Sequence, residues 1–327
     1  MLNISQIGVG YWGPNLLRNL IANNRCEVKK IAEVSSERRD YVRKLYPALH
    51  TTDTADDIFD DSSVDAVIIA KPVATHFDLA MRALSSGKHI LVEKPLAKSL
   101  QEVDLLEREA SKGDLLVMAG HTFLFNAAVR YVKKLIDQGD LGDIRYIYSQ
   151  RLNLGRIRSD VDALWNFAPH DLSIVQYWMN NPKPVSVVKR GVDYIQSGID
   201  DVVFMDIVYP GKVMVNIHVS WLDPRKVRSM TVVGSKKMVV YDDIADDKIA
   251  VYDKGIDRKA VLGEHMDYDR PYFQSFTHRS GDILLPKVNF EEPVKVEIDH
   301  FIDCIQNGVE CMAGLGHARR VVEILAQ

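Results

Sequence analysis

The feature that most constrains the fold is a regular alternation of apolar runs and amphipathic stretches over the first 120 residues. Short apolar runs indicate β-strands at 2–7, 28–34, 64–70, 89–92 and 115–119. Stretches with helical periodicity lie between them, at 15–22, 36–45, 76–85 and 99–111. Strands that alternate with helices through short connections form a parallel sheet with both faces covered. The pattern therefore predicts an α/β fold whose first part, residues 1–120, is a doubly wound domain.

The remainder of the chain, residues 121–327, has a different pattern. Helices are expected at 127–138 and 164–179, and two more close the chain at 294–306 and 317–325. Between these pairs lie long strand-like runs at 185–193, 201–209, 213–221, 229–233 and 237–242. Turn residues separate neighbouring runs, as Pro210-Gly211 does. This part is predicted to be an α+β domain with a large open antiparallel sheet, serving substrate binding and oligomerisation.

Composition excludes several classes of function. The 327 residues carry 41 Lys+Arg and 45 Asp+Glu, and no basic block exceeds two residues, so a nucleic-acid-binding face is not expected. No apolar run is long enough to cross a membrane, and the first residues do not resemble a secretory leader. Three cysteines (Cys26, Cys304 and Cys311) are too few for a disulfide framework and too badly spaced for a metal clip. We therefore expect a cytoplasmic protein without membrane, nucleic-acid or metal partners.

A glycine motif lies between the first expected strand and the first expected helix. The sequence Gly8-Val9-Gly10-Tyr11-Trp12-Gly13 is a G-x-G-x-x-G, the loop that holds a dinucleotide pyrophosphate in Rossmann domains. Gly8 would allow the tight turn, Gly10 the approach of the pyrophosphate, and Gly13 the close packing of helix on strand. Glu33 follows Gly13 by 20 residues, where an acid binds the adenosine ribose. The alternative is a tight turn without a ligand.

The same region bears on the choice of cofactor. A carboxylate at Glu33 would repel a 2′-phosphate, which favours NAD, whereas Arg38 and Arg39, one turn into the next helix, could neutralise that phosphate and admit NADP. Tyr11 and Trp12 are expected to flank the nicotinamide or the pyrophosphate, or else to cover the first helix. Thr75 and His76 are expected to belong to a loop that lines the adenine or nicotinamide side of the cofactor site.

Lys94 follows the fifth strand within Glu93-Lys94-Pro95, and ligands of such sheets bind beyond the carboxyl ends of the strands. At this point the sequence resembles the Gfo/Idh/MocA oxidoreductases, a family named for glucose-fructose oxidoreductase, inositol dehydrogenase and a rhizopine-catabolism protein. The resemblance covers nearly the whole chain and is carried by five segments in order: 8–13, 68–76 (Ile-Ile-Ala-Lys-Pro-Val-Ala-Thr-His), 93–95, 120–126 (Gly-His-Thr-Phe-Leu-Phe-Asn) and 168–171 (Ala-Pro-His-Asp).

The resemblance implies an NAD(P)-dependent dehydrogenase that oxidises a secondary alcohol. His170 matches the family's catalytic histidine and would act as general base, while Lys94 would bind the reacting oxygen, with the Lys94–Pro95 peptide cis. Asn126 would lie near the nicotinamide carboxamide, although it could equally cap the helix that follows it. Glu93, in the same motif as Lys94, is also expected to contribute to cofactor binding. Without the flanking motif, His170 would be read as an ordinary core or dimer-surface histidine.

The substrate is indicated by a departure from the family and by a basic segment. Asn166 stands where family members acting on inositol or simple sugars tend to carry an aspartate, one helical turn before His170. Arg156 and Arg158 could hold a diphosphate, with Trp165 stacking nearby, and this segment resembles the branch that oxidises C3 of nucleotide-linked sugars. A UDP-linked sugar is the leading substrate; an inositol or free sugar, and a non-catalytic dinucleotide-binding protein, are the alternatives. The family's habit implies a homodimer or homotetramer.

Overall fold

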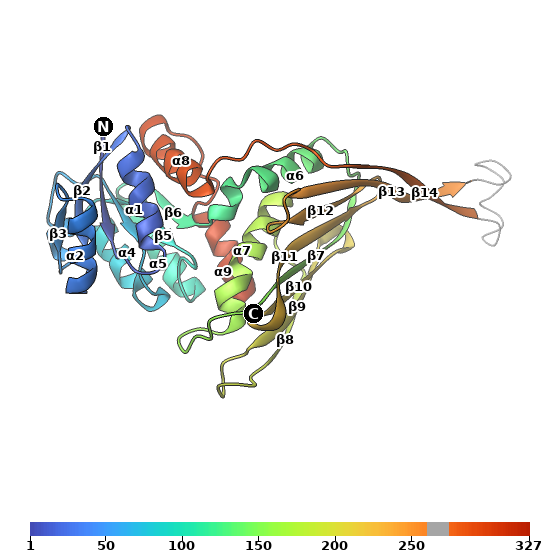
Figure 1. The fold of residues 1–327 in the computed structure, drawn as a ribbon, viewed down its shortest axis with the longest axis horizontal. Coiled ribbons are helices and arrows are strands. Elements are labelled where there is room, and N and C mark those ends of the chain that lie inside the picture. Colours follow the sequence, from blue (N-terminus) through green and yellow to red (C-terminus); the bar gives the residue numbers. More distant parts are fainter. Residues whose placement is uncertain (260–274) are drawn as a thin grey trace. The chain divides into compact units, whose positions relative to one another are not determined.

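The computed structural model describes residues 1–259 and 275–327, and Figure 1 shows its course. The chain divides into two compact units that are discontinuous in sequence. Unit 1 comprises Met1–Ala127, Pro169–Asn181 and Phe290–Gln327, and unit 2 comprises Ala128–Ala168 and Pro182–Asn289. Each unit is described by itself. The segment Phe290–Gln327, expected with the second part of the chain, therefore belongs to the same compact unit as the N-terminal sheet.

Unit 1 is built on a six-stranded parallel sheet with the strand order β3-β2-β1-β4-β5-β6. This order confirms the predicted doubly wound fold. The second strand covers Cys26–Ala32 rather than 28–34, because Cys26 and Glu27 pair in register with Leu2 and Asn3. The strands are β1 (Leu2–Ile7), β2 (Cys26–Ala32), β3 (His50–Thr52), β4 (Ala66–Ile69), β5 (His89–Glu93) and β6 (Val117–Gly120).

Helices cover both faces of this sheet, and successive residues of each central strand supply the two faces. On β4, Val67 and Ile69 pack with α3, α4, α5 and α9, whereas Ala66 and Ile68 pack with α1 and α8. All four residues are fully buried, which explains the continuous apolar run in the sequence. The helices are α1 (Gly13–Ala22), α2 (Ser36–Leu45), α3 (Asp56–Phe59), α4 (His76–Ser85), α5 (Leu100–Lys112), α8 (Pro293–Asn307) and α9 (Leu315–Leu325), with 3₁₀ turns η1 (Val73–Thr75) and η2 (Thr122–Phe125).

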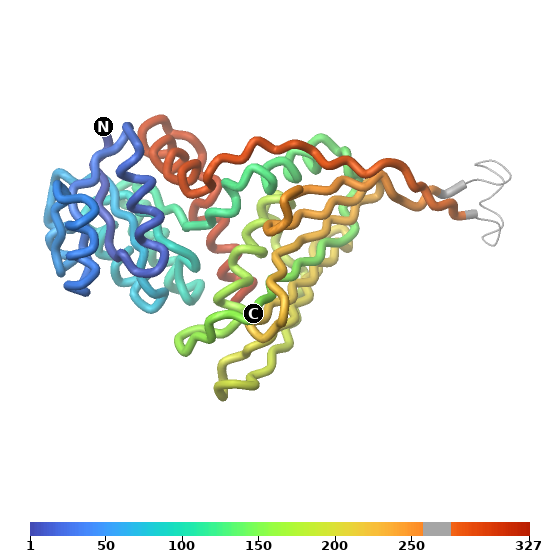
Figure 2. Tube along the Cα trace, viewed as in Figure 1, coloured from blue at the N-terminus to red at the C-terminus, as the bar shows by residue number. Residues whose placement is uncertain are grey.

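The last two helices lie on opposite faces of the N-terminal sheet. Helix α8 buries Ile298, Phe301 and Ile302 in the core that α1 also enters, and α9 places Ala318 in the core of the other face. Figure 2 shows helix α8, in red, beside helix α1, in blue. The amphipathic patterns at 294–306 and 317–325 predicted these helices correctly but did not indicate which sheet they cover.

Unit 2 is built on an eight-stranded sheet with the order β14-β13-β12-β11-β7-β10-β9-β8. The sheet is mixed rather than wholly antiparallel, because β10 pairs with β7 in parallel while the other neighbours are antiparallel. Its strands are β7 (Ile144–Leu154), β8 (Ser186–Val192), β9 (Val202–Tyr209), β10 (Val213–Ser220), β11 (Leu222–Gly234), β12 (Met238–Asp242), β13 (Ile249–Lys259) and β14 (Ser275–Leu284), with helix α6 (Ala127–Asp137) before them and the turn η3 (Pro210–Lys212) between β9 and β10.

Helix α7 (Ala163–Trp178) begins in unit 2 and ends in unit 1. Asp162 marks its start, because the Asp162 carboxylate accepts a hydrogen bond from the Trp165 N–H at 2.8 Å. Pro169 lies inside this helix, next to His170. No helix in the described parts of the chain is both long enough and apolar enough to cross a membrane.

Candidate active site

The glycine loop connects β1 to α1 and depends on its glycines for different reasons. Gly8 has a φ of +97°, and a Cβ there would lie 2.4 Å from the carbonyl oxygen of Ala70. A Cβ on Gly13 would lie 2.5 Å from the carbonyl oxygen of Gly8, so helix and loop pack with no room for a side chain. A Cβ on Gly10 would approach nothing closer than Arg38 Nη1, at 3.5 Å. Gly10 therefore leaves an open approach at the helix N-terminus, as a pyrophosphate requires.

Gln6 fixes this loop and was not identified from the sequence. Its side-chain Nε2 donates hydrogen bonds to the carbonyl oxygens of Gly8, at 2.8 Å, and Gly13, at 2.9 Å. Gln6 is fully buried in β1. A polar residue inside an apolar strand, two positions before the glycine motif, was the available signal.

Glu33 follows β2 and is almost fully buried. Its carboxylate accepts hydrogen bonds from the N–H groups of Val9, at 2.9 Å, and Ser35, at 3.1 Å. Burial favours a raised pKa, but these two donors and the charges of Lys71 and Arg38 outweigh it and hold the pKa of Glu33 below its usual value. Glu33 is therefore ionised at neutral pH, and it ties the glycine loop to the end of β2.

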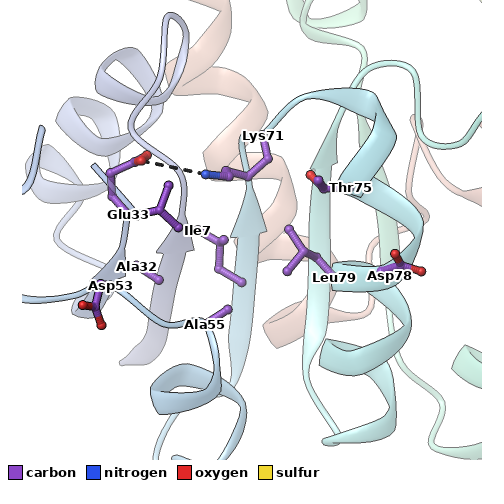
Figure 3. A pocket seen from close by; sticks show the side chains of 10 residues that line it. Ile7, Ala32, Glu33, Asp53, Ala55, Lys71, Thr75, Asp78 and Leu79 are labelled. Atoms are coloured by element: carbon purple, nitrogen blue, oxygen red, sulfur yellow. Dashed lines mark ion pairs between the residues drawn. The ribbon is translucent and has the colours of Figure 1, made fainter. Parts of the chain in front are cut away.

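A cavity of about 250 Å³ opens beside Glu33 (Figure 3). Lys71 Nζ lies 3.8 Å from Glu33 Oε1 at one side of it, where the two side chains point toward one another. Apolar side chains form much of the remaining wall. A small apolar chamber with a charged rim suits a nucleoside, whose base is flat and whose ribose carries hydroxyl groups. The lining residues are Ile7, Ala32, Glu33, Val34, Asp53, Ala55, Lys71, Thr75, Asp78 and Leu79.

The other residues expected at the cofactor lie around this cavity and loop. Thr75 lines the cavity, and Arg38 stands beside Gly10. Tyr11 and Trp12 are both exposed at the N-terminus of α1, so they remain accessible to a ligand. Arg39 donates hydrogen bonds to the carbonyl oxygen of Glu33, at 2.6 Å, and to that of Val34. Arg38 is therefore the better placed of the two arginines for contact with a cofactor phosphate.

Lys94 follows β5, and the Lys94–Pro95 peptide bond is cis. His76 packs against this segment: its ring nitrogens lie 2.8 Å from the carbonyl oxygen of Pro95 and 2.7 Å from that of Lys71. Burial lowers the pKa of His76. The ring thus joins the segments that follow β4 and β5, and it is not among the residues that line the cavity at Glu33.

His170 and Asn126 both belong to unit 1. The His170 ring packs edge-on against Phe123, with 5.0 Å between ring centroids. Phe123 lies in η2, directly after β6, and β6 is the neighbour of β5, the strand that ends before Lys94. The structure therefore brings His170 to the same edge of the sheet as Lys94. Asn126 is buried between η2 and α6.

The other residues expected at the substrate, Arg156, Arg158, Trp165 and Asn166, lie in unit 2 and are described within that unit. Arg156 is exposed, whereas Arg158 forms a two-pronged ion pair with Asp160, with Nε to Oδ1 at 2.8 Å. These hydrogen bonds raise the pKa of Arg158 and occupy two of the donor groups of its guanidinium. Trp165 and Asn166 lie in the first turn of α7 and are partly exposed.

Two of the cysteines meet, although their sequence spacing did not predict it. Cys304, Cys311 and His300 place their ligand-type atoms within 4.8 Å of one another, because the chain turns back at Gly308 with a φ of 65°. His300 Nε2 already accepts a hydrogen bond from the Met312 N–H at 3.1 Å. Burial raises the pKa of Cys311 to about 12, so its thiol is protonated at neutral pH. We assign no ion to this group.

Comparison with known proteins identifies the class. Residues 2–121 match the family described as "Oxidoreductase family, NAD-binding Rossmann fold", and residues 129–240 match the "GFO/IDH/MocA C-terminal domain". Together these matches span most of the chain. The protein is therefore an oxidoreductase-family protein with an NAD-binding Rossmann fold, and it belongs to the Gfo/Idh/MocA family.

The individual proteins that resemble this chain in sequence or structure do so at low sequence identity. The 4-carboxy-2-hydroxymuconate-6-semialdehyde dehydrogenase of Sphingobium is 29% identical over 54% of this chain and 58% of its own length. The UDP-N-acetylglucosamine 3-dehydrogenase of Acidithiobacillus ferrooxidans is 32% identical over 42% of this chain and 43% of its own. A putative oxidoreductase from Magnetospirillum magnetotacticum, known from its crystal structure, is 25% identical with a TM-score of 0.83 over 99% of this chain and 98% of its own. The chain thus spans only about half the length of these two curated relatives.

Proposed function

We propose that this protein transfers a hydride between a secondary alcohol of a nucleotide-linked sugar and NAD. The observation that carries the proposal is the gathering of His170 and Lys94 at one edge of the sheet that also bears the glycine loop and the cavity at Glu33. A dehydrogenase needs an acid–base group beside the carbon that faces the nicotinamide, and that edge is where ligands of such sheets bind.

The proposed chemistry assigns one task to each residue. Lys94 donates a hydrogen bond to the reacting hydroxyl and stabilises the negative charge that grows on its oxygen. His170 accepts the hydroxyl proton while the hydride leaves the same carbon. The bound nicotinamide supplies the hydride acceptor. Alcohol and NAD⁺ thereby give ketone, NADH and one proton, and the reverse reaction uses the same residues.

The cofactor assignment rests on the charges around the cavity. We propose Glu33 as the partner of the adenosine ribose hydroxyls, because each oxygen keeps a lone pair beside its one backbone hydrogen bond. Gly8, Gly10 and Gly13 would hold the pyrophosphate, with Tyr11, Trp12 and Asn126 toward the nicotinamide. Lys71 and Arg38 offset part of the Glu33 charge, so the preference for NAD over NADP is expected to be modest.

Within unit 2, Arg156 is the proposed contact for the substrate diphosphate, and Trp165 and Asn166 the proposed contacts for the sugar. The relative from Acidithiobacillus, a UDP-N-acetylglucosamine 3-dehydrogenase, supports this substrate class and oxidation at C3. The engagement of Arg158 by Asp160 leaves fewer free cations for a diphosphate. That observation favours, as a second candidate, a dehydrogenase of inositol or a free sugar.

A substrate panel tests the proposal. UDP-sugars, free sugars and inositols are each mixed with NAD⁺, and the absorbance of reduced nicotinamide is followed. We expect turnover with a UDP-sugar, a loss of at least a hundredfold in kcat for Lys94→Ala, consistent with the usual size of acid–base contributions, and full activity for Lys98→Ala, a nearby exposed lysine. Turnover that survives Lys94→Ala would refute the mechanism. Turnover with inositol alone, and not with any UDP-sugar, would establish the second candidate.

A further inference from the structure

A second group of buried polar side chains lies in unit 1, away from the cavity. Glu297 of α8 is fully buried, and its Oε2 accepts a hydrogen bond from Thr122 Oγ1 at 2.8 Å. Its other oxygen, Oε1, is also inaccessible and has no hydrogen-bond partner among the described residues. A carboxylate in such a place would carry a full charge with only one neutral donor, which is strongly unfavourable.

Glu93 lies against the segment that contains Thr122, the partner of Glu297. It pairs in register with Gly120, and a Cβ on Gly120 would lie 3.3 Å from Glu93 Oε2, so the missing side chain makes room for this carboxyl group. The Lys94 N–H donates to that oxygen at 3.3 Å. Glu93 Oε1 is buried and, within the described parts of the chain, lacks a partner. Thr122, the partner of Glu297, stands two residues after Gly120.

The two carboxyl groups oppose each other's ionisation. Burial, reinforced by the nearby charge of Glu93, raises the pKa of Glu297 well above its usual range. Burial also raises the pKa of Glu93 to about 7, against the opposing effect of the Lys94 charge. Because Lys94 favours the charge on Glu93, the two groups are not equivalent: Glu93 ionises first and Glu297 keeps its proton.

We propose that Glu93 and Glu297 form a carboxyl pair behind Lys94 that holds one proton, with Glu297 as a neutral carboxylic acid and Glu93 as a counter-charge of the lysine. Both are positioning residues that act through Lys94. The part concerning Lys94 in catalysis rests on the proposed function; the part concerning the proton does not.

Other titratable groups face this pair or Lys94. His76, from α4, and His121, after β6, both face Lys94, and burial lowers their pKa values. Burial lowers the pKa of His317, the neighbour of His121, to about 4. Cys311, which faces Glu297, has a raised pKa. These shifts disfavour positive charge on the histidines and negative charge on the cysteine, whereas the charge of Lys94 favours the ionised form of Glu93.

The pH dependence of folding tests the proton on Glu297 without any enzyme assay. In the unfolded chain this carboxyl ionises near pH 4.5, whereas in the folded protein it stays protonated, so the unfolded state binds fewer protons and wild-type stability falls as pH rises. Glu297→Gln keeps the shape and the Thr122 contact but cannot ionise. Its unfolding equilibrium constant is measured in urea beside that of the wild type.

We expect the ratio of wild-type to Glu297→Gln unfolding constants to rise about tenfold per pH unit from about pH 5 to the folded-state pKa of Glu297. A ratio that stays flat from pH 5 to 8 would mean that Glu297 is ionised in the fold and would overturn the proposal. If the variant does not fold, ¹³C-carboxyl NMR of the wild type at pH 8, above the pKa of Glu93, decides instead: a glutamate signal that remains at the protonated shift supports the proposal, and its absence overturns it.

The pH profile of kcat/KM tests the link to Lys94. Glu93→Gln removes the counter-charge, so the lysine pKa falls and the limb that reports it moves by about one pH unit toward acid. Glu297→Gln leaves that limb in place, because it replaces one neutral group by another. If this limb lies at the same pH in the wild type and in Glu93→Gln, Glu93 is not a counter-charge of Lys94 and the proposal is overturned. Absence of turnover with every substrate would instead refute the proposed function and leave the unfolding result standing.

Discussion

Glu33 illustrates how much of the cofactor site is fixed at the scale of single residues. Two backbone N–H groups and the charge of Lys71 keep its carboxylate ionised in a buried position. The sequence predicted the residue from its distance to the glycine motif. It did not reveal Lys71 as the opposing charge, because Lys71 is far away in sequence and meets Glu33 only when β2 and β4 end at the same edge of the sheet.

Replacing Glu33 by glutamine is expected to alter cofactor choice. The variant removes one negative charge and leaves Lys71 and Arg38, so affinity for NADP relative to NAD should rise about tenfold, equivalent to about 1.4 kcal/mol. Dissociation constants for both cofactors, measured by quenching of tryptophan fluorescence, give the ratio. Asp78→Asn, which removes a carboxylate from another part of the same cavity wall, is the matched control and should change the ratio less. Equal losses for both cofactors in Glu33→Gln would contradict the ribose contact.

Two of the residues that the sequence did not identify, Gln6 and Glu297, are polar and buried. Gln6 and Glu297 occupy positions that a pattern of apolar and polar residues assigns to the solvent side of a strand or helix. Their burial depends on partners 2 to 175 positions away along the chain. Local periodicity contains no information about the distant partner of Glu297, whereas the place of Gln6 in an apolar strand beside the glycine motif was a usable signal.

At the scale of elements, the sequence predicted most strands and helices because their apolar residues repeat with the period of each structure. What it could not predict was pairing. The parallel match of β7 with β10, and the packing of α8 and α9 on the first sheet, join segments between about 60 and 300 residues apart. An amphipathic helix shows that one face is buried, but it does not show against what.

Helix α8 should therefore matter to the stability of the cofactor-binding unit. Phe301→Ala removes a fully buried ring from the core shared with α1, at a cost of about 3–5 kcal/mol in the free energy of unfolding. Urea unfolding followed by far-ultraviolet circular dichroism measures the loss. Phe290→Ala removes a mostly exposed ring of the same kind and should cost much less. Similar losses in the two variants would show that α8 is not part of this core.

At the scale of the whole molecule, the eight-stranded sheet leaves one face uncovered within unit 2. Val203, Met205 and Ile207 are buried on one face, as expected, while Phe204 and Met214 on the other are 47% and 52% exposed. Tyr146 and Tyr148 stack on the exposed face beside Met214. An apolar, aromatic face of this kind is typical of an interface. We propose that it joins copies of the chain into a homodimer or homotetramer.

A charge placed on this face tests the assembly. Phe204→Glu should prevent association, because two carboxylates would be buried at a symmetric interface. Sedimentation velocity is expected to give the mass of an oligomer for the wild type and about half or a quarter of it for the variant. Leu105→Glu, on the exposed side of α5, is the control and should leave the mass unchanged. An oligomer that persists in Phe204→Glu would place the interface elsewhere.

In the proposed reaction, a hydride passes from a sugar carbon to the nicotinamide beside Lys94 and His170. The most direct measurement supplies a UDP-sugar deuterated at C3 together with unlabelled NAD⁺ and determines the mass of the recovered nicotinamide cofactor. We expect one deuterium on the reduced nicotinamide and a ketone at C3, with both products absent for Lys94→Ala. Deuterium that stays on the sugar, or is lost to water while the cofactor remains unlabelled, would contradict it.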